Sequence, residues 1–525
     1  MRDLHLPGRS PVLALNGMCA TSHPLAAQVA VETLKQGGNA MDAAIAGAVL
    51  LGLCEPQMTG IGGDAFALFT PPGSDEVLAY NGSGRAPAAA DAAALRAQGH
   101  ETVPTYSAHA VTIPGAIEAF CALSDGHGKL GLDRLLAPAI HYADQGVPVA
   151  PRVAFDWPAD TETLQGHGLA HFSSNGKPLK TGDIFHAPGQ AEVLRRIARD
   201  GPRAFYEGEV AEDMCAALTE LGGVHTPDDF ARHTGTRETP VAGTYKGTEL
   251  LEHPPNSQGA TAILLLNILK NFDITAMDPV GCARAHIEAE ATRLAYDTRN
   301  RILGDPDHTT RLEAMLAQET ADRLAALIDP DRAITSVTPL TEAIHRDTIY
   351  ITVVDRDRMA VSLIYSVFHG FGSGIASEKF GIGLQNRGAG FTLQEGHPNE
   401  MKGGKRPMHT IIPGMLRNQG RVTMPFGVMG GGYQPQGHAR FLSNLTDFGM
   451  DPQEAIDAPR VFADGTLLKL ERGYAPEVHQ ALADMGHDVV IPDEPLGGAQ
   501  AIHIGADGLL TGGSDPRKDG CALGY

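Results

Sequence analysis

Two strand-like segments joined by a short charged turn constrain the fold of this chain more than any other feature. Residues 348–355 and 359–366 are rich in β-branched, aromatic and aliphatic side chains, and Asp and Arg residues separate them. Runs this close in sequence pair as an antiparallel hairpin. That pairing places Thr348 opposite Tyr365 or Ser366, depending on the loop length. The sequence therefore predicts that the hydroxyl of Ser366 lies beside Thr348 at one end of a sheet.

Upstream of this hairpin the pattern is mainly helical, with glycine-rich turns. Ser22 is predicted to cap one helix, Asn39 a second helix over residues 40–54, and residues 283–301 form a long third. A strand is expected at residues 65–69, after a glycine cluster. With 525 residues, the chain is long enough for three or four domains or for one large body of helices and strands.

Composition and charge exclude several classes of protein. Hydrophobic residues make up 42% of the chain and charged residues 20%, which rules out a disordered or fibrous protein. The net charge of −21 argues against nucleic acid as a partner. The longest apolar stretch, residues 43–54, is too short to span a bilayer, so no membrane partner is expected. The first residues lack the apolar core of a signal peptide, so we expect a cytoplasmic location.

The sequence contains no clear cofactor or metal motif. Six scattered cysteines form no C-x-x-C pair, which excludes the usual zinc spacings and a disulfide scaffold. The glycines at 370–374 lack the full dinucleotide fingerprint. His286 and Glu290 stand at helical spacing, and we expect them on a solvated helix surface. We therefore predict neither a cofactor nor a bound metal ion.

Thr348 is a candidate nucleophile because of its position at the head of a strand. A threonine hydroxyl is a weak nucleophile unless a base activates it, and a cut directly before the residue supplies its own α-amine as that base. The amine has a reference pKa of about 7.7–8.0, close to working pH. The Asp347–Thr348 bond could provide this cut, although a strand-forming threonine without catalytic function has the same appearance.

The glycine run at residues 430–432 is the second candidate feature. Successive glycines can aim backbone N–H groups at one point and so form an oxyanion hole, here with Gly430 and Gly431 as donors. A plain glycine-rich turn would give the same pattern. Position alone does not separate these alternatives.

Several motifs in order along the chain carry a resemblance to a known family. The chain resembles the γ-glutamyltranspeptidase family of N-terminal-nucleophile (Ntn) hydrolases over nearly its whole length. The matching segments are Gly37-Gly38-Asn39-Ala40-Met41-Asp42-Ala43-Ala44, Gly60-Ile61-Gly62-Gly63, Val111-Thr112-Ile113-Pro114-Gly115, Pro254-Pro255-Asn256-Ser257-Gln258-Gly259, Asp347-Thr348, Phe371-Gly372-Ser373-Gly374-Ile375, Gly430-Gly431 and Gly513-Ser514-Asp515-Pro516-Arg517.

The resemblance implies an α+β fold, a four-layer αββα sandwich made as one precursor. The precursor would cleave itself before Thr348 into a large subunit, residues 1–347, and a small subunit, residues 348–525. The two would stay interwoven in a single body. Thr348 matches the family's nucleophile, Ser366 a supporting hydroxyl, and Gly430 and Gly431 the donors to the oxyanion.

Departures from the family pattern bear on the substrate. The positions of the residues that bind a glutamyl head group hold Ser83 in place of Arg, Ala389 in place of Asp and Phe368 in place of Asn, while His409 and Thr410 replace paired serines. Each missing charge-assisted contact is worth about 1.5–3 kcal/mol, so glutathione should be a poor donor. The pattern looks more like the divergent branch that contains oxamate amidohydrolase and glutaryl-cephalosporin acylases.

These comparisons lead to one main hypothesis and two alternatives. We expect an autoprocessed amidohydrolase that cleaves a small amide with a carboxylate-bearing acyl group. Arg85 and Arg387 are the candidates for holding that carboxylate, although both could be structural ion-pair residues, and His409, Thr410, Tyr433 and Gln434 are further candidates for the pocket. The alternatives are a true γ-glutamyltransferase with an altered head-group site and a catalytically silent binding relative. A homo-oligomer is possible in each case.

Overall fold

Two stacked β-sheets form the centre of the molecule. We describe residues 5, 8–334 and 348–525 of a computed structural model. The first sheet has the strand order β19 (Cys521–Gly524), β2 (Met18–Thr21), β10 (Ile349–Val354), β11 (Ala360–Ser366), β3 (Asp64–Phe69), β4 (Leu78–Gly82) and β7 (Thr236–Glu238). The second has the order β1 (Val12–Ala14), β18 (Leu510–Ser514), β17 (Gly498–Ile504), β13 (Arg421–Met429), β12 (Gly414–Asn418), β9 (Thr248–Glu252) and β8 (Val241–Tyr245).

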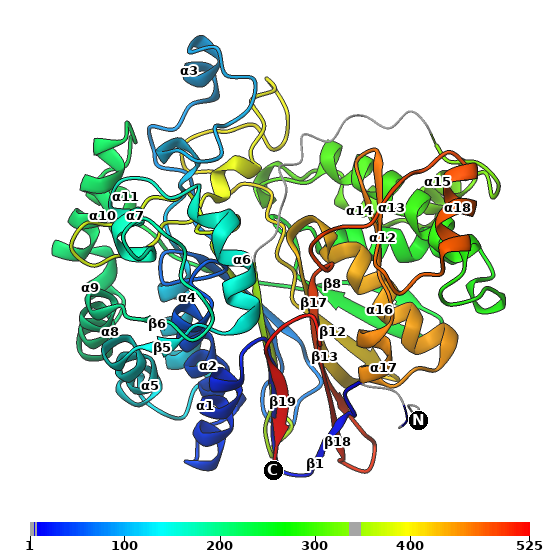
Figure 1. The fold of residues 1–525 in the computed structure, drawn as a ribbon, viewed down its shortest axis with the longest axis horizontal. Coiled ribbons are helices and arrows are strands. Elements are labelled where there is room, and N and C mark those ends of the chain that lie inside the picture. The colour runs from blue at the N-terminus through cyan, green and yellow to red at the C-terminus, as the bar shows by residue number, and fades with distance from the viewer. Residues whose placement is uncertain (1–4, 6–7, 335–347) are drawn as a thin grey trace.

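Helices cover the outer face of each sheet (Figure 1). The first sheet is covered by α1 (Pro24–Lys35), α2 (Ala40–Cys54), α4 (Ala116–His127), α5 (Leu132–Gln145), α6 (Pro151–Thr161), α8 (Pro188–Asp200) and α10 (Glu209–Glu220). The second is covered by α12 (Gly259–Leu269), α13 (Cys282–Ile302), α15 (Gln318–Ala325), α16 (Gln434–Phe448), α17 (Pro452–Asp457) and α18 (Pro476–Asp484). The order helix, sheet, sheet, helix confirms the expected four-layer αββα architecture.

Smaller elements complete the described part of the chain. A minor sheet contains β14 (Val461–Asp464), β15 (Leu467–Leu470) and β16 (Asp488–Val490), and a two-stranded ribbon contains β5 (Val147–Pro148) and β6 (Ile184–Phe185). The short helices are α3 (Ala92–Ala97), α7 (His167–Phe172), α9 (Arg203–Tyr206), α11 (Pro227–Ala231) and α14 (Leu312–Leu316). None of the helices in the described ranges is both long and apolar enough to cross a bilayer.

Side-chain alternation along β10 decides which residues face the space between the sheets. Ile349, Ile351 and Val353 pack among the helices over the first sheet. Tyr350 instead packs with Met429 of β13 in the second sheet. Since side chains alternate along a strand, Thr348 lies on the same side as Tyr350 and points between the sheets.

The helix α2 forms the core of the helical layer over the first sheet. All of its residues are buried. Asn39 caps it as expected: its side chain accepts a hydrogen bond from the Asp42 N–H, and the Asp42 carboxylate accepts one from the Asn39 N–H. The expected cap at Ser22 is wrong. His23 is the N-cap of α1, since Pro24 takes the first helical position, and the Ser22 hydroxyl instead donates to the carboxylate of Glu55.

Each sheet contains strands from before and strands from after Thr348. In the first sheet β10 lies between β2 and β11, and β11 pairs with β3. In the second sheet β12 pairs with β9, while β1 pairs with β18. The residues before and after Thr348 therefore share one core and form a single body.

Candidate active site

Thr348 lies one residue before β10 and opposite Ser366. Ile349 pairs with Tyr365, so the next position toward the edge brings Thr348 to Ser366. The Thr348 Oγ1 lies 3.5 Å from the Ser366 Oγ. Both residues are 1% exposed. The juxtaposition predicted from the hairpin is confirmed, with Ser366 rather than Tyr365 as the partner.

The glycine turn that follows β13 lies across the gap between the sheets from Thr348. Gly430 and Gly431 have φ angles of 112° and 52°, values that favour glycine. A Cβ on Gly430 would lie 2.9 Å from the Cα of Gly497, so the turn has no room for a side chain. The turn leads directly into α16, and Met429 just before it packs against Tyr350. Its backbone is therefore close to the end of β10 at which Thr348 lies.

Arg387 reaches this same edge and is fully buried. Its Nη2 donates to the Ser366 Oγ at 3.1 Å, and its Nη1 donates to the Thr410 Oγ1 at 2.9 Å. The guanidinium stacks on the Phe368 ring, 4.1 Å from its centroid. Its Nε has no hydrogen-bond partner among the described residues. Burial lowers the pKa of Arg387 to about 9, although the carboxyl group of Asp64 opposes this shift.

Asp64 begins β3 directly opposite Ser366 and supplies the nearest negative charge. Its Oδ1 accepts hydrogen bonds from the N–H groups of Gly84 and Gly115, each at 3.0 Å, and its Oδ2 lies 3.2 Å from the His409 Nε2. Burial raises the pKa of Asp64 to about 7, against the opposing effect of Arg387 and the two N–H donors. Burial and nearby cations lower the pKa of His409, so its ring is neutral and its Nε2–H donates to Asp64.

We name this group the Arg387 flank of Thr348; it consists of Arg387, Asp64, His409, Thr410 and Phe368. In this group the buried Arg387 guanidinium, whose Nε is unpaired, lies next to the Ser366 hydroxyl, which in turn contacts Thr348. A buried donor without a partner is costly, and a planar guanidinium suits a carboxylate ligand. The flank therefore holds a buried positive charge with one unpaired donor atom near Thr348.

Comparison with known proteins places the chain in a family. The family model described as Gamma-glutamyltranspeptidase matches residues 26–525. The chain belongs to the Gamma-glutamyltranspeptidase family. The "Glutathione hydrolase-like YwrD proenzyme" of Bacillus subtilis is 35% identical and the alignment covers 98% of this chain and 99% of that protein.

Two further relatives are named for other amide substrates. The "Oxamate amidohydrolase proenzyme" of Klebsiella pneumoniae is also 35% identical, over 98% of this chain and 99% of that protein. The crystal structure of cephalosporin acylase from Bacillus halodurans superimposes with a TM-score of 0.92 at 38% identity, covering 100% of this chain and 98% of that one. As a family member, the chain is an amidohydrolase of the Ntn type, and the proenzyme names indicate processing of one precursor into two subunits.

The other predicted pocket residues of this Gamma-glutamyltranspeptidase-family member lie in different surroundings. Arg85 is at the surface, where it donates to the Gly404 carbonyl at 3.0 Å and its Nη1 lies 3.7 Å from the Asp305 carboxylate. Tyr433 packs against Phe462 in the core beneath the helices over the second sheet. Of the two arginines, Arg387 is thus the one that the structure joins to Ser366.

Gln434 and Asp347 complete the set of predicted site residues. Gln434 accepts a hydrogen bond from the Ile412 N–H at 2.8 Å, and its Nε2 is buried without a hydrogen-bond partner among the described residues. Asp347 lies outside the described residues. The cleavage before Thr348 therefore remains a prediction.

Three residues were predicted to replace the head-group ligands of the family, and the structure shows the surroundings of each. Ser83 is fully buried, and its hydroxyl donates to the Asn81 Oδ1 at 2.7 Å. Ala389 packs against a small apolar cluster that includes Phe391. Phe368 carries the Arg387 guanidinium on its ring. None of these three side chains carries a charge.

The expectation that His286 and Glu290 lie on a solvated surface is wrong. Both are fully buried, and with His487 they form a group whose ligand atoms lie within 4.8 Å of one another. Arg293 donates to the His487 Nδ1 at 3.1 Å; the His487 Nε2 then donates to the His286 Nδ1 at 2.7 Å, and the His286 Nε2 to the Asp329 carbonyl at 2.8 Å. These hydrogen bonds use every ring nitrogen, and the Arg293 guanidinium repels a cation.

Sequence reasoning assigned no function to Asp64 and did not single out Lys518. Asp64 directly follows the glycine cluster at residues 60–63 and begins a strand whose residues are all buried. A carboxylate at the start of such a strand is a signal that could have been used, since buried acids require partners. Lys518 follows the Ser514–Arg517 motif, and sequence alone gives no reason to expect a lysine there to be buried.

Proposed function

We propose that this protein is cleaved before Thr348 into subunits 1–347 and 348–525 and that Thr348 is then the nucleophile. The Thr348 Oγ attacks the acyl carbon of an amide while its proton passes to the α-amine of the same residue. The C–N bond breaks as the leaving amine takes that proton, which leaves an ester on Thr348. Water then attacks the ester, releases the acid and restores the hydroxyl.

The glycine turn is proposed to stabilise the negative charge that develops on the acyl oxygen. The N–H groups of Gly430 and Gly431 follow β13 at the same edge as Thr348, and neither residue has a side chain that could cover them. Preorganised backbone donors of this kind are worth about 10²–10³ in kcat. Ser366 is proposed to support Thr348 through its hydroxyl contact.

The buried Arg387 is the observation that carries the substrate proposal. It lies two hydrogen-bond contacts from the Thr348 Oγ1, by way of the Ser366 Oγ, and its Nε is unpaired. A carboxylate attached directly to the scissile carbonyl, as in oxamate, spans this short distance. A glutaryl carboxylate, three methylene groups further away, must fold back to reach the same guanidinium. We therefore propose that the substrate is a small amide with a short, carboxylate-bearing acyl group, of the oxamate type.

Processing provides the first test. The Thr348→Ala protein should remain one chain, because no hydroxyl is left to attack the preceding carbonyl, and its amidase activity should fall at least about 10³-fold. The Thr348→Ser protein is the matched control and should still be cleaved. Intact mass and N-terminal sequencing report both results. A Thr348→Ala chain that still splits at this bond would refute the mechanism, and a parent chain that stays whole and inactive would indicate a silent relative.

Substrate preference provides the second test. We expect kcat/KM to decrease from oxamate to a glutaryl amide and to be lowest for a γ-glutamyl anilide. The anilide carries an α-amino group, and the acid on the Arg387 flank, Asp64, already accepts hydrogen bonds from the Gly84 and Gly115 N–H groups. A preference for the γ-glutamyl anilide would favour the second candidate, a true γ-glutamyltransferase.

A further inference from the structure

Lys518 is a buried cation near the sheet edge at which Thr348 lies, and it contacts other residues than Arg387 does. It is 5% exposed, and its Nζ lies 3.7 Å from the Sδ of Met58. The Met58 carbonyl accepts a hydrogen bond from the Val367 N–H at 3.2 Å, directly after Ser366. The aliphatic part of the Lys518 side chain packs on Gly498. A Cβ added to Gly498 would lie 2.8 Å from the Cγ of Lys518 and 2.8 Å from the Cε of Met429.

These contacts place the side chain of Lys518 across the start of β10. Its stem touches the second sheet next to the glycine turn, and its ammonium ends beside the loop that holds the end of β11. The backbone of Gly520 lies against Thr21 and Ser22 at the end of β2, the neighbour of β10. The ammonium therefore lies near the ends of β2 and β11, the two strands between which β10 begins one residue after Thr348.

Glu55 is the buried acid on this side. It is 1% exposed, at the C-terminal end of α2, and it accepts a hydrogen bond from Ser22. Burial raises the pKa of Glu55 to about 7, against the opposing charge of Lys518. We name the group of Lys518, Glu55, Ser22 and Met58 the Lys518 flank. At neutral pH the Glu55 carboxyl group is only partly ionised, so it offsets only part of the positive charge of Lys518.

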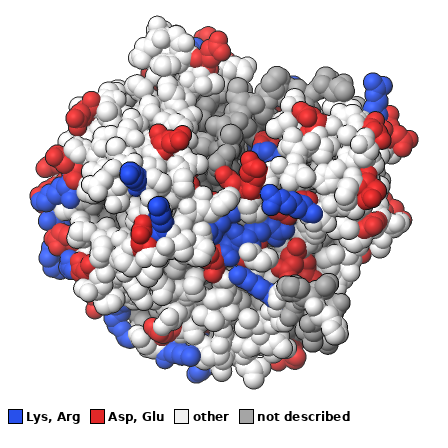
Figure 2. All heavy atoms as spheres, viewed as in Figure 1, with Lys and Arg blue, Asp and Glu red and all other residues white. Residues whose placement is uncertain are grey.

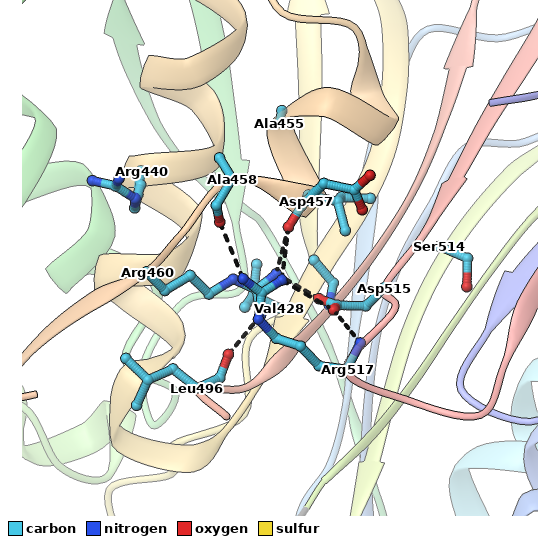
Figure 3. Close-up of polar contacts among 12 residues, drawn as sticks. Val428, Arg440, Ala455, Asp457, Ala458, Arg460, Leu496, Ser514, Asp515 and Arg517 are labelled. Atoms are coloured by element: carbon cyan, nitrogen blue, oxygen red, sulfur yellow. Dashed lines mark hydrogen bonds and ion pairs between the residues drawn. The ribbon is translucent and has the colours of Figure 1, made fainter. Parts of the chain in front are cut away.

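The loop that carries Lys518 is fixed by buried ion pairs (Figure 3). The Asp515 carboxylate accepts hydrogen bonds from Arg460 at 2.5 Å and from the Ala499 N–H at 2.6 Å, and it pairs with Arg517 at 3.3 Å. Although burial alone would raise it, these two guanidinium groups hold the pKa of Asp515 below its usual value. Arg9 closes the loop by donating to several backbone carbonyls, including that of Lys518 at 3.4 Å.

Lys and Arg side chains gather on one face of the molecule, although the whole chain is acidic. The net charge is −21, yet Figure 2 shows Lys and Arg side chains gathered near the middle of one face, around the position of β17 in Figure 1. Besides Lys518 and Glu55, the charged or titratable groups near this edge are Asp64, His409, Arg387, His369, Asp156 and Asp519. A positive charge close to an amine favours the neutral amine.

We propose that Lys518 is a positioning residue for catalysis: its fixed positive charge keeps the freed α-amine of Thr348 unprotonated, so that the amine can accept the hydroxyl proton. This inference rests on the proposed cleavage before Thr348. It assigns the two buried cations different tasks, since Arg387 meets the substrate and Lys518 acts on the nucleophile's own base.

The pH dependence of kcat/KM for oxamate tests this inference. In the cleaved Lys518→Met protein, the acidic limb of the profile of kcat/KM against pH should move to higher pH by about one unit. At a pH below this limb kcat/KM should then fall about tenfold, while KM at a pH above the limb should stay unchanged. The Lys518→Arg protein should keep the parent profile. Lys405→Met is the matched control, because Lys405 is 6% exposed and donates to the Pro398 carbonyl instead.

A second readout measures the amine itself. The pH dependence of acylation of the Thr348 α-amine, followed by mass spectrometry of the N-terminal peptide, should shift by the same amount in Lys518→Met. If Lys518→Met is not cleaved, Glu55→Gln tests the same role by a shift in the opposite direction. It removes the anion that balances Lys518, so the acidic limb of the kcat/KM profile should move to lower pH.

The outcomes separate this inference from the proposed function. A parent that is cleaved and active, but whose acidic limb does not respond to Lys518→Met or Glu55→Gln, would refute the role of Lys518 alone. If Lys518→Met raises KM for oxamate and leaves the acidic limb of the kcat/KM profile at the same pH, Lys518 binds the substrate instead. A parent that stays whole would refute the proposed function and this inference together.

Discussion

On the Arg387 flank of Thr348 a buried guanidinium donates to two hydroxyl groups, whereas on the Lys518 flank a buried ammonium rests against a thioether sulfur. Both flanks also hold a buried carboxyl group, Asp64 on one side and Glu55 on the other, with a pKa raised to about 7. The charges are thus alike, but the geometry is not. Arginine offers a planar set of donors that selects a carboxylate, while lysine offers a compact charge.

This difference indicates why one site would use two kinds of cation. Recognition of a substrate requires directed hydrogen bonds, and Arg387 has its Nη1 and Nη2 aligned while its Nε is unpaired. Control of an amine's protonation requires only nearby charge, which a compact ammonium such as that of Lys518 supplies. Replacing arginine by lysine on the Arg387 flank should therefore lower activity more than replacing lysine by arginine on the Lys518 flank.

The largest effect is expected when each cation is replaced by the other type. Arg387→Lys should lower kcat/KM for oxamate about 100-fold, because one ammonium cannot replace the fork that joins Ser366, Thr410 and a substrate carboxylate. Lys518→Arg should stay within about threefold of the parent, because the charge is retained. Steady-state kinetics on cleaved protein, confirmed by intact mass, measures both. Equal losses in the two variants would remove the distinction between the flanks.

A smaller effect concerns the two carboxyl groups. Their raised pKa values mean that the folded protein binds more protons than the unfolded chain between about pH 4 and pH 7. The free energy of unfolding should therefore decrease as pH rises through this window. Asp64→Asn and Glu55→Gln should each remove part of that decrease, on the order of 2–3 kcal/mol between pH 5 and pH 8.

Urea unfolding in the uncleaved Thr348→Ala background measures this effect on a single chain. Both amide variants lose hydrogen bonds at every pH, so the informative quantity is the difference between the two pH values rather than either stability alone. If a variant and its parent differ by the same amount at pH 5 and pH 8, that carboxyl group has an ordinary pKa.

The smallest effect is expected at the edge of the Lys518 flank. Arg9→Ala removes a guanidinium that donates to backbone carbonyls of the loop, among them Gly520 at 2.7 Å and Lys518 at 3.4 Å. We expect a loss of about 1 kcal/mol in unfolding free energy and a change of less than about threefold in kcat/KM. Exposed Arg356→Ala is a suitable control. A large loss of activity without a loss of stability would mean that Arg9 takes part in the site directly.

Local patterns in the sequence were sufficient to predict several elements. The cap of α2 at Asn39 and the pairing of Thr348 with Ser366 depend on residues close together in the chain, and both predictions are confirmed. The cap predicted at Ser22 is wrong because Pro24 takes the first helical position and makes His23 the cap, while Glu55, 33 positions away, binds the Ser22 hydroxyl. A cap assignment cannot anticipate a competing partner that only the tertiary fold provides.

Contacts between distant segments account for what the sequence could not provide. His286 and Glu290 have the spacing of an exposed helical pair, but burial depends on which face of α13 meets the loop carrying His487, 201 positions from His286. Arg387 was a candidate by residue type alone. Its burial and its bond to Ser366 emerge only when β11 and the segment after it are folded together.

Both sheets combine strands from either side of Thr348, and this has a consequence for how the molecule is made. While the chain is continuous, β10 finds its place between β2 and β11 by an intramolecular search. Once the bond before Thr348 is cut, the two pieces would have to meet by diffusion and rebuild both sheets jointly, in a step that slows with dilution. The mature molecule would then be long-lived through its unfolding barrier, and loss of structure in dilute solution would be permanent.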